Sequence, residues 1–426
     1  MTQKRILIFV FVALFIALGG YGLIQFAKGY RFNLAQKNFQ PSGLLVATST
    51  PDGAQIFVNG ELKSATNTTL YLAPGTYNVE LKKDGFRLWQ KTLKIDKEMV
   101  SRTDAWLFPI VPDFRASTYT GASNPSLSPD NSKIIYTVSG NLPEKDGLWV
   151  LELSDMPFVS QEPRQILKSL PHNRDLSKVT FNWSPDSRQV LVAAHSGKTE
   201  ENYLLDSTVL NSPNILVDMT PNLQIIQKQW ATEKQIKQDQ KMAKLPKALA
   251  QLLIDNANQI LFSPDETKIL YSAIKDVTIP DGLISLIPSF SNQPQQRQLK
   301  QGQNYIYDIK EDRNYLIKGD NQCAIGFALP TPTPTPTKGK TQNGQSTTET
   351  LGCILTWFPT SRHVLFIEKD KVSIVEFEGT NATTIFEGSY QFPFAFPHPS
   401  ANRIMILTTL TNAQDAVLNL YSVSLR

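Results

Sequence analysis

Few residues of this 426-residue chain have the types and the spacing that catalysis or metal binding requires. The chain contains two cysteines, Cys323 and Cys353, and four histidines that lie far apart in the sequence. No motif places a nucleophile beside a base, two histidines one helical turn apart, or glycines in a phosphate-binding loop. We therefore predict no catalytic residue, no cofactor-binding residue and no metal site.

The two cysteines are better suited to a disulfide than to catalysis, because neither lies in a nucleophile motif. In an oxidising compartment, a bond between Cys323 and Cys353 would close a loop of about 30 residues and stabilise the fold by roughly 3–4 kcal/mol on the chain-entropy argument. Free thiols are the alternative. Residues 328–350 lie inside this loop, and their low-complexity, proline- and threonine-rich sequence predicts a disordered segment.

A Ser-Pro-Asp triplet recurs along the chain, each time ahead of a run of β-forming residues. Proline presets the φ angle of a turn, and an Asp or Ser side chain can bond to the backbone just beyond it. We therefore interpret these acids as turn residues rather than as paired catalytic carboxylates. The predicted turn residues are Pro129 and Asp130, Pro185 and Asp186, Pro264 and Asp265, Pro359, and Pro397. A further, weaker copy is predicted at residues 308–312.

The spacing of these turns indicates the fold that carries them. Copies about 40–50 residues apart fit four-stranded blades, and the longer gap before Pro264 contains a helical pattern that predicts an insertion over residues 223–257. The repeats resemble those of TolB-like and WD-repeat-like β-propellers across residues 114–426. The six copies predict six blades, with seven as the alternative, and the last copy, which has only three strands, is expected to take its fourth from residues 115–119.

The predicted helical insertion carries four lysines on one face, and two interpretations remain open. The lysines form either an ordinary solvated face or a patch for an anionic surface polymer or lipid. They are Lys234, Lys237, Lys241 and Lys244.

Residues 43–98 alternate short strand-like stretches with hairpin turns, which predicts a small antiparallel β-sandwich. Two of its motifs carry a resemblance to the PEGA domain, namely Pro51-Asp52-Gly53-Ala54 and Pro74-Gly75. The resemblance implies a non-catalytic module of bacterial envelope and surface proteins that acts as a spacer or an adhesion unit. Residues 99–113 are predicted to connect this module to the propeller.

Ile6–Ile24 is a stretch of 19 residues without a charge. A helix of that length spans roughly 28 Å, close to the hydrocarbon thickness of a bilayer. We therefore predict a cytoplasmic tail and a transmembrane signal anchor over residues 1–29, followed by a linker at 30–42. A cleaved signal peptide is the alternative. Two cations in the short leading tail favour a cytoplasmic N-terminus and place residues 30–426 outside the cell membrane.

The charges are nearly balanced, with 42 basic and 38 acidic residues spread along the chain, which argues against a nucleic-acid partner. We expect a mainly β, single-pass, non-catalytic protein of the cell envelope that contacts the lipid bilayer through Ile6–Ile24. Its PEGA module would space an extracytoplasmic propeller that binds a surface protein, peptide or glycan. The alternative is a propeller-type envelope enzyme, such as a lyase or a peptidase-like protein.

Overall fold

The computed structural model describes ten segments of the chain, and the predicted disordered loop at 328–350 lies outside them. The described residues are 2–27, 30–33, 38–140, 144–155, 162–196, 199–284, 293–317, 323–327, 352–410 and 417–426. The chain divides into two compact units, which we describe separately. One contains Met1–Ile110 and Leu286–Pro294, and the other contains Val111–Ser285 and Gln295–Arg426.

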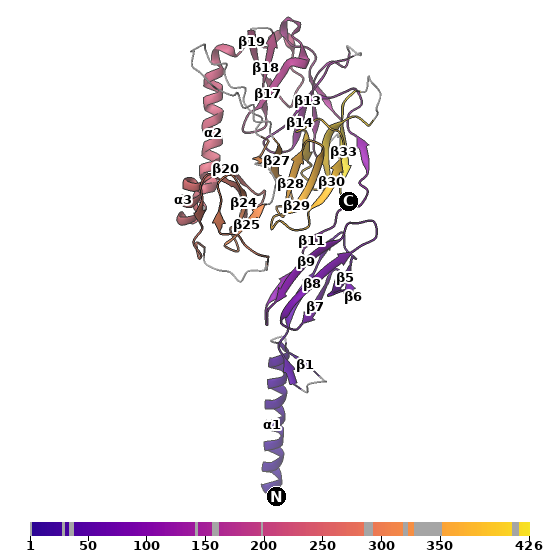
Figure 1. The fold of residues 1–426 in the computed structure, drawn as a ribbon, viewed down its shortest axis with the longest axis vertical. Coiled ribbons are helices and arrows are strands. Elements are labelled where there is room, and N and C mark those ends of the chain that lie inside the picture. Colours follow the sequence, from indigo (N-terminus) through magenta and orange to yellow (C-terminus); the bar gives the residue numbers. More distant parts are fainter. Residues whose placement is uncertain are drawn as a thin grey trace. The chain divides into compact units, whose positions relative to one another are not determined.

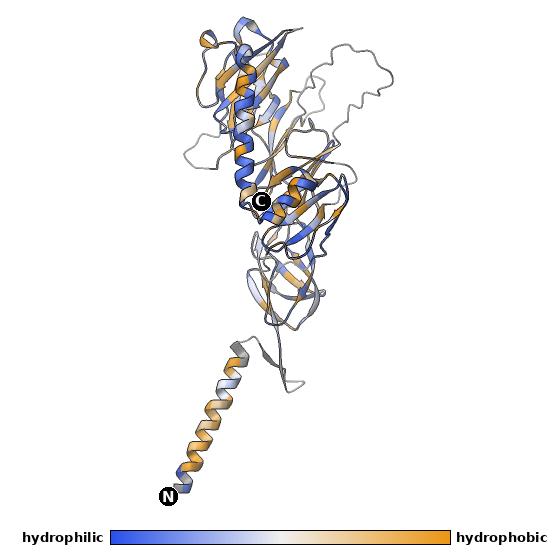
Figure 2. Ribbon diagram, turned by 90° about the vertical axis from the view of Figure 1, so that its left-hand side faces the viewer, coloured by the Kyte–Doolittle hydropathy of each residue, from blue (hydrophilic) through white to orange (hydrophobic). Residues whose placement is uncertain are grey.

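Helix α1 (Thr2–Ala27) begins the first unit (Figure 1). The helix is apolar over most of its length (Figure 2). Its stretch Arg5–Ile24 has a mean hydropathy of 2.6, and none of the stretch is buried. At about 1.5 Å per residue, these 20 residues extend about 30 Å. By length and composition the helix could therefore cross a membrane, or serve as a signal sequence.

The β module after α1 packs a four-stranded antiparallel sheet against a second, smaller one. The first sheet has the order β6 (Glu61–Ala65), β5 (Gln55–Val58), β8 (Gly75–Lys82) and β9 (Trp89–Ile95). The second has the order β10 (Val100–Arg102), β3 (Gly43–Ala47) and β7 (Thr68–Leu72). Strand β9 alternates buried and exposed residues from end to end, as expected for a sheet with one face on the core. Its Trp89 and Ile95 join Leu45, Ile56 and Leu81 in that core.

The module extends beyond the boundary predicted at residue 98. Strand β10 runs parallel to β3, and β11 (Ala105–Trp106) runs parallel to β4 (Ser49–Thr50). The first part of the predicted connector 99–113 therefore belongs to the module. These strands are too short for a periodic sequence pattern, and each pairs with a partner more than 50 residues earlier. In the predicted linker 30–42, β1 (Arg31–Asn33) and β2 (Asn38–Gln40) form a two-stranded ribbon.

The second unit is a β-propeller, and its described residues form five blade sheets, which we number 1 to 5 along the chain. Sheet 1 contains β13 (Ser123–Leu127), β14 (Lys133–Val138), β15 (Gly147–Glu152) and β16 (Arg164–Leu167). Sheet 2 contains β17 (Val179–Trp183), β18 (Gln189–Ser196) and β19 (Thr199–Asp206), and a single bridge between Tyr203 and Asp218 takes the fourth position. Sheet 3 contains β20 (Ala257–Phe262), β21 (Lys268–Ala273), β24 (Asn304–Asp308) and β25 (Arg313–Ile317), with the ribbon β22 (Val277–Thr278) and β23 (Gln298–Leu299) between β21 and β24.

The last two sheets complete the propeller. Sheet 4 contains β26 (Ala324–Ile325), β27 (Cys353–Trp357), β28 (His363–Glu368), β29 (Lys371–Glu376) and β30 (Thr383–Glu387). Sheet 5 contains β31 (Ala395–Pro397), β32 (Arg403–Thr408) and β33 (Asn419–Ser424), together with β12 (Phe114–Ala116) from the start of the domain. The predicted closure of the last blade by residues near 115 is therefore confirmed. This pairing covers an edge that would otherwise be open to aggregation.

The described residues do not show the six or seven blades predicted. The weak copy predicted at residues 308–312 is the hairpin between β24 and β25, the last two strands of sheet 3. The described residues therefore show five sheets and no blade beginning at that hairpin. Polar turn residues followed by an apolar strand occur in any hairpin, so the pattern alone does not show whether a turn begins a blade or ends one.

In the described residues, neighbouring sheets pack apolar or aromatic side chains against one another at four of the five joints. Apolar clusters join sheets 1 and 2, sheets 3 and 4, and sheets 1 and 5. Aromatic pairs join sheets 4 and 5, with ring centroids 5.8 Å apart for Phe114 and Phe386 and 5.1 Å apart for Phe327 and Phe396. Burial of each large aliphatic side chain contributes about 1.5–3 kcal/mol, so these clusters supply much of the stability of the ring.

Helices α2 (Leu223–Ala243) and α3 (Lys247–Asn256) connect sheet 2 to sheet 3 and occupy the predicted insertion 223–257. Pro246 directly precedes α3, where its missing N–H costs nothing. Leu249 and Leu253 lie one turn apart on α3 and are buried against sheet 3.

Candidate functional site

In sheets 1 to 4 the predicted turn residues lie at the same place, in the turn between two neighbouring antiparallel strands, and sheet 5 has an equivalent turn. In sheet 1 the N–H of Ser128 donates to the carbonyl of Lys133 at 2.9 Å, and the N–H of Asn131 donates to the carbonyl of Ser128 at 2.9 Å. The other four turns repeat both bonds. The first residues of the five turns are Ser128, Ser184, Ser263, Phe358 and His398. The fourth residues, all with φ between 56° and 61°, are Asn131, Ser187, Glu266, Ser361 and Ala401.

The turn of sheet 5 begins later than the sequence pattern suggested. Pro397 is the last residue of β31, and Pro399 takes the position that Pro129, Pro185, Pro264 and Pro359 hold in the other turns. His398 is therefore the counterpart of Ser128, and Ser400 is the counterpart of Asp130. Two prolines two residues apart fit the motif equally well, and only the backbone hydrogen bonds decide between them.

Each turn carboxylate is held by hydrogen bonds within its own turn. Asp130 Oδ1 accepts from Ser128 Oγ at 2.6 Å and from the N–H of Ser132 at 3.0 Å. Burial alone would raise the pKa of Asp130, but these hydrogen bonds lower it overall and keep the carboxylate ionised. Asp186 and Asp265 accept equivalent bonds from the first serine of their turns, at 2.6 and 2.7 Å. These acids are therefore turn-stabilising acceptors.

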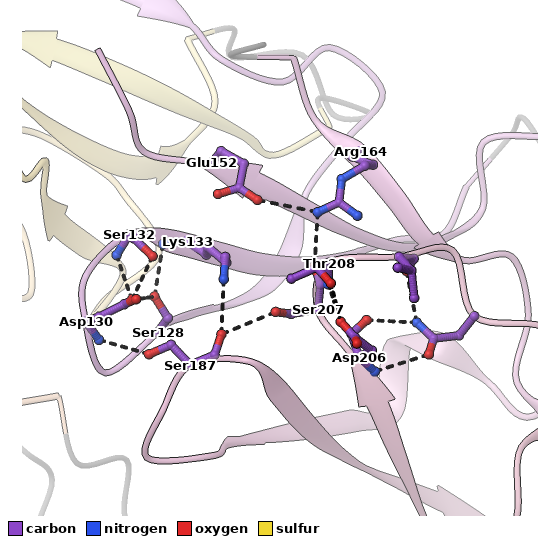
Figure 3. A network of polar contacts seen from close by, with 12 residues as sticks. Ser128, Asp130, Ser132, Lys133, Glu152, Arg164, Ser187, Asp206, Ser207 and Thr208 are labelled. Atoms are coloured by element: carbon purple, nitrogen blue, oxygen red, sulfur yellow. Dashed lines mark hydrogen bonds and ion pairs between the residues drawn. The ribbon is translucent and has the colours of Figure 1, made fainter. Parts of the chain in front are cut away.

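The turns of neighbouring sheets also bind one another, which the sequence did not reveal (Figure 3). The N–H of Asp130 donates to Ser187 Oγ at 3.1 Å, and Lys133 Nζ donates to the carbonyl of Ser187 at 3.1 Å. The N–H of Asp265 likewise donates to Ser361 Oγ at 3.0 Å. We call this contact the hydroxyl clasp; it links sheets 1 and 2, and sheets 3 and 4. The signal in the sequence is a serine at the fourth turn position.

The clasp of sheets 1 and 2 continues into a polar network on the outer strands (Figure 3). Ser207 Oγ donates to the carbonyl of Ser187 at 3.3 Å. Arg164 Nη2 donates to the carbonyl of Ser207 at 3.0 Å and lies 3.4 Å from Glu152 Oε1. Asp206 Oδ1 accepts from the N–H of Thr208 at 2.7 Å and so fixes the turn after β19. The network therefore connects the turn of sheet 1, the turn of sheet 2 and the turn after β19 at the joint between sheets 1 and 2.

The fifth turn holds a histidine, a serine and an aspartate together, the set most like a catalytic triad among the described residues. His398 Nδ1 lies 2.7 Å from Ser400 Oγ, and Arg403 Nη2 lies 3.1 Å from His398 Nε2. Asp155, which follows β15, pairs with Arg403 and accepts from Asn402 Nδ2 at 2.9 Å. We call this group the charged latch, because it joins the turn of sheet 5 to Asp155, which lies between β15 and β16 of sheet 1.

The chemistry of the charged latch favours positioning over nucleophile activation. A guanidinium can only donate, so His398 Nε2 accepts from Arg403. Ser400 also directs its backbone N–H at His398 Nδ1, at 3.3 Å, so Ser400 contacts this ring nitrogen twice within the turn and helps to position the imidazole. Desolvation by burial, followed by the Arg403 charge, lowers the pKa of His398 to about 4. The imidazole therefore stays neutral near pH 7.

The other three histidines lie on separate elements. His172 is in a 3₁₀ turn with Nδ1 3.7 Å from Glu201 Oε2, and His195 on β18 has Nδ1 3.5 Å from Glu200 Oε2. His363 begins β28, with Nδ1 2.9 Å from Thr360 Oγ1. In the part of the chain that the structure describes, no three His, Cys, Asp or Glu side chains form a group that could hold a metal ion.

Cys323 and Cys353 form a disulfide, and their Cα atoms are 4.7 Å apart. Both cysteines are buried in the apolar cluster between sheets 3 and 4. The carbonyl of Cys323 also accepts a hydrogen bond from Asn304 Nδ2 at 3.0 Å, which ties the bridge to sheet 3. The disulfide therefore joins the starts of β26 and β27 within sheet 4, inside the apolar cluster that packs this sheet against sheet 3.

The predicted PEGA motif residues form turns of the β module. Gly53 has a φ of 72°, which a residue with a side chain rarely adopts, and Ala54 is fully buried. The N–H of Ala54 donates to Thr66 Oγ1 at 2.9 Å, while the carbonyl of Asp52 accepts from Lys83 Nζ at 2.8 Å. Pro74 directly precedes β8, and Gly75 is its first residue. The contacts of these motif residues stabilise turns of the β module.

Comparisons with known proteins agree with the β module. Residues 42–107 match the PEGA domain family, a range that includes β10 and β11. A search of curated proteins finds none that matches the chain. The chain is also similar to several solved structures at low identity, all with TM-scores too low to support an argument. The propeller assignment therefore rests on the strand pairing.

Three of these similar structures illustrate the range of proteins found. TolB from Acinetobacter baumannii is 12% identical, with 82% of this chain and 60% of that chain covered and a TM-score of 0.19. The β-propeller domain of the Trilobed protease from Pyrococcus furiosus is 11% identical, with coverages of 90% and 96% and a TM-score of 0.21. An acylaminoacyl peptidase from Pyrococcus horikoshii is 11% identical, with coverages of 92% and 52% and a TM-score of 0.21.

Proposed function

We propose that this chain is a membrane-anchored protein of the cell envelope, in which the PEGA domain spaces a β-propeller from the bilayer. The propeller binds a surface protein, peptide or glycan, and the N-terminus lies in the cytoplasm. The observation that carries the proposal is the exposed apolar stretch Arg5–Ile24, which ends less than 20 residues before a PEGA domain. A bilayer would cover that stretch and hold the domains at a surface.

The construction of the propeller supports a binding role. The turn carboxylates are held within their turns, and the histidine of the charged latch is capped by a guanidinium. Clasps and apolar clusters fix neighbouring sheets against one another at most joints, which makes a scaffold for recognition loops. Such a scaffold suits binding of a partner with little rearrangement.

Anchoring and orientation are tested on the full chain in cells. Wild-type protein should stay with membranes after an alkaline wash, and protease added outside intact cells should cleave it. The variant Leu14→Arg with Phe15→Arg, which adds two charges at the middle of the stretch at about 2.5–3.5 kcal/mol each, should lose membrane retention. The matched control Leu14→Ile with Phe15→Leu should behave as the wild type. Wild-type protein recovered in the cytosol would refute the anchor.

Binding is tested by crosslinking intact cells that carry the full chain and identifying what is captured. Enrichment of one surface protein, peptide or glycan over cells without the chain would support the proposal. The rival interpretation, a propeller-type lyase or peptidase-like enzyme, predicts turnover of a panel of peptides and glycans by the purified protein. Turnover of a panel member that Ser400→Ala abolishes would favour the enzyme and count against a purely binding role.

A further inference from the structure

The joint between sheets 2 and 3 differs in chemistry from the two clasped joints. At the turn position where Ser187 and Ser361 supply the clasp hydroxyl, sheet 3 has Glu266. A carboxylate can accept a hydrogen bond, but here it accepts from helix α2. Lys244 Nζ lies 2.7 Å from Glu266 Oε2, and Lys241 Nζ lies 3.3 Å from Glu266 Oε1. The turn of sheet 3 is therefore bound by a helix.

The same helix also contacts the turn of sheet 2. Lys237 Nζ donates to the carbonyl of Pro185 at 2.8 Å. Lys237, Lys241 and Lys244 are spaced four and three residues apart, so they lie on one face of the helix. One row of three lysines thus reaches the turns of both sheets. These lysines are therefore neither a purely solvated face nor a free patch for an anionic polymer.

Further contacts tie the helix to sheet 3. Lys241 Nζ lies 5.7 Å from the centre of the Phe262 ring, and Gln238 Nε2 donates to the carbonyl of Ile260 at 3.5 Å. In Figure 1, α2 runs from the region of β17–β19 to α3 and β20. The helix therefore bridges the two sheets.

Among the described residues, sheets 2 and 3 share no apolar cluster, and the buried apolar side chain of α2 is Trp230. Those formed by the described residues join sheets 1 and 2, sheets 1 and 5, and sheets 3 and 4, and a further cluster joins sheet 3 to α3. None of these four includes side chains of both sheet 2 and sheet 3. Ion pairs between partly exposed groups are weak and are screened by salt, whereas apolar burial is not. The side chain of Lys244 is 67% exposed and that of Glu266 is 34% exposed.

We propose that α2 is an ionic brace that closes the propeller ring between sheets 2 and 3, and that the ring opens locally at this joint. The contacts of Lys241 and Lys244 with Glu266, and of Lys237 with Pro185, set how often it opens. Raised ionic strength or an anion that competes for the lysines loosens the brace. Opening separates sheet 2 from sheet 3 while the clasped and clustered joints stay closed.

The test is hydrogen exchange of the purified full chain at 0.05 and 0.5 M NaCl. Glu266→Gln removes both ion pairs and keeps the shape of the side chain. We expect it to raise the exchange rates of α2 and of the turns of sheets 2 and 3 about two- to five-fold at low salt. High salt should raise the wild-type rates similarly and have little further effect on the variant. The control Glu61→Gln removes a 2.7 Å surface pair with Lys63 in the β module, outside the propeller, and should leave these rates unchanged.

The salt dependence of the wild-type protein tests the brace even if a variant folds poorly. Reversing the charges, with Glu266→Lys combined with Lys241→Glu and Lys244→Glu, should restore the low exchange rates. Salt-independent exchange of α2 in the wild type would overturn the proposal. An equal rise of exchange in sheets 1, 4 and 5 would also overturn it, because the opening would then be global.

Discussion

Two pairs of neighbouring sheets, 1 with 2 and 3 with 4, use the same hydroxyl clasp but differ in what surrounds it. In the first pair, Lys133 reaches from its turn to the carbonyl of Ser187 near the surface. In the second, Lys268 holds the equivalent position but is buried, with Nζ 3.6 Å from Asp308 Oδ2 and 4.7 Å from the centre of the Phe377 ring. The second pair also carries the disulfide. A recurring turn therefore supplies a common contact, and each joint adds its own reinforcement.

The two equivalent lysines provide the sharpest test of this difference. Lys268→Met should lower the free energy of unfolding by about 3–5 kcal/mol, because it leaves Asp308 buried without its partner. Burial already raises the pKa of Asp308, so the carboxylate depends on this cation. Lys133→Met should cost less than about 1 kcal/mol. Urea unfolding measures both, and equal losses would contradict the comparison.

Loss of the disulfide should have the next largest effect on the free energy of unfolding. Reduction, or Cys323→Ala with Cys353→Ala, should lower the free energy of unfolding by about 3–4 kcal/mol, because an open loop of about 30 residues has more freedom in the unfolded chain. Hydrogen exchange should rise first in sheets 3 and 4, while sheets 1 and 2 serve as the internal control. Thiol labelling of the denatured, unreduced protein checks the bond, and two reactive thiols would contradict it.

The charged latch extends the comparison to the joint between sheets 1 and 5. Its contribution can be measured from the dependence of the unfolding free energy on pH. The pKa of His398 is about 4 in the folded protein and near 6.5 when unfolded. The unfolded state thus binds the proton first as pH falls, so stability should drop between about pH 6.5 and 4, by about 3 kcal/mol in total. The lowered pKa of Asp155 adds a loss only below its usual range near 3.8.

Replacing the latch histidine by the residues of other turns isolates this effect. His398→Ser reproduces the first residue of turns 1 to 3, and His398→Phe reproduces Phe358 of sheet 4. Both should flatten the dependence of the unfolding free energy on pH between 6.5 and 4. A slope that persists unchanged in both variants would show that another group is responsible.

Removal of a hydroxyl clasp should have the smallest effect on the free energy of unfolding, and the effect should be similar at both clasped joints. Ser187→Ala and Ser361→Ala each remove one hydroxyl acceptor and should each cost about 1 kcal/mol. Similar values would show that the clasp is an independent unit, whatever surrounds it. Thermal unfolding of the two single variants and the double variant measures this, and the two losses should add, because different sheets carry them. A cost several times larger at one joint would contradict a common unit.

The sequence predicted local features well and long-range ones unevenly. The apolar stretch, the PEGA motifs, the turn prolines and the closing strand near residue 115 all depend on short patterns that a few neighbouring residues set. The fifth turn was misplaced by two residues because Pro397 and Pro399 fit the same pattern. The copy at 308–312 suggested an extra blade because a hairpin within a blade uses the same turn residues.

The sequence by itself determined the local elements of this protein. These are an apolar helix, a β module with tight turns, and repeated turns that begin β-hairpins. Such features depend on φ preferences, on hydrogen bonds across a few residues and on hydrophobic periodicity. Only the tertiary structure decided that Ser187 and Ser361 clasp the preceding turns, that His398 lies beside Asp155, and that α2 joins sheets 2 and 3. These contacts link residues tens to hundreds of positions apart. The stacking of whole sheets, which no local pattern encodes, brings them together.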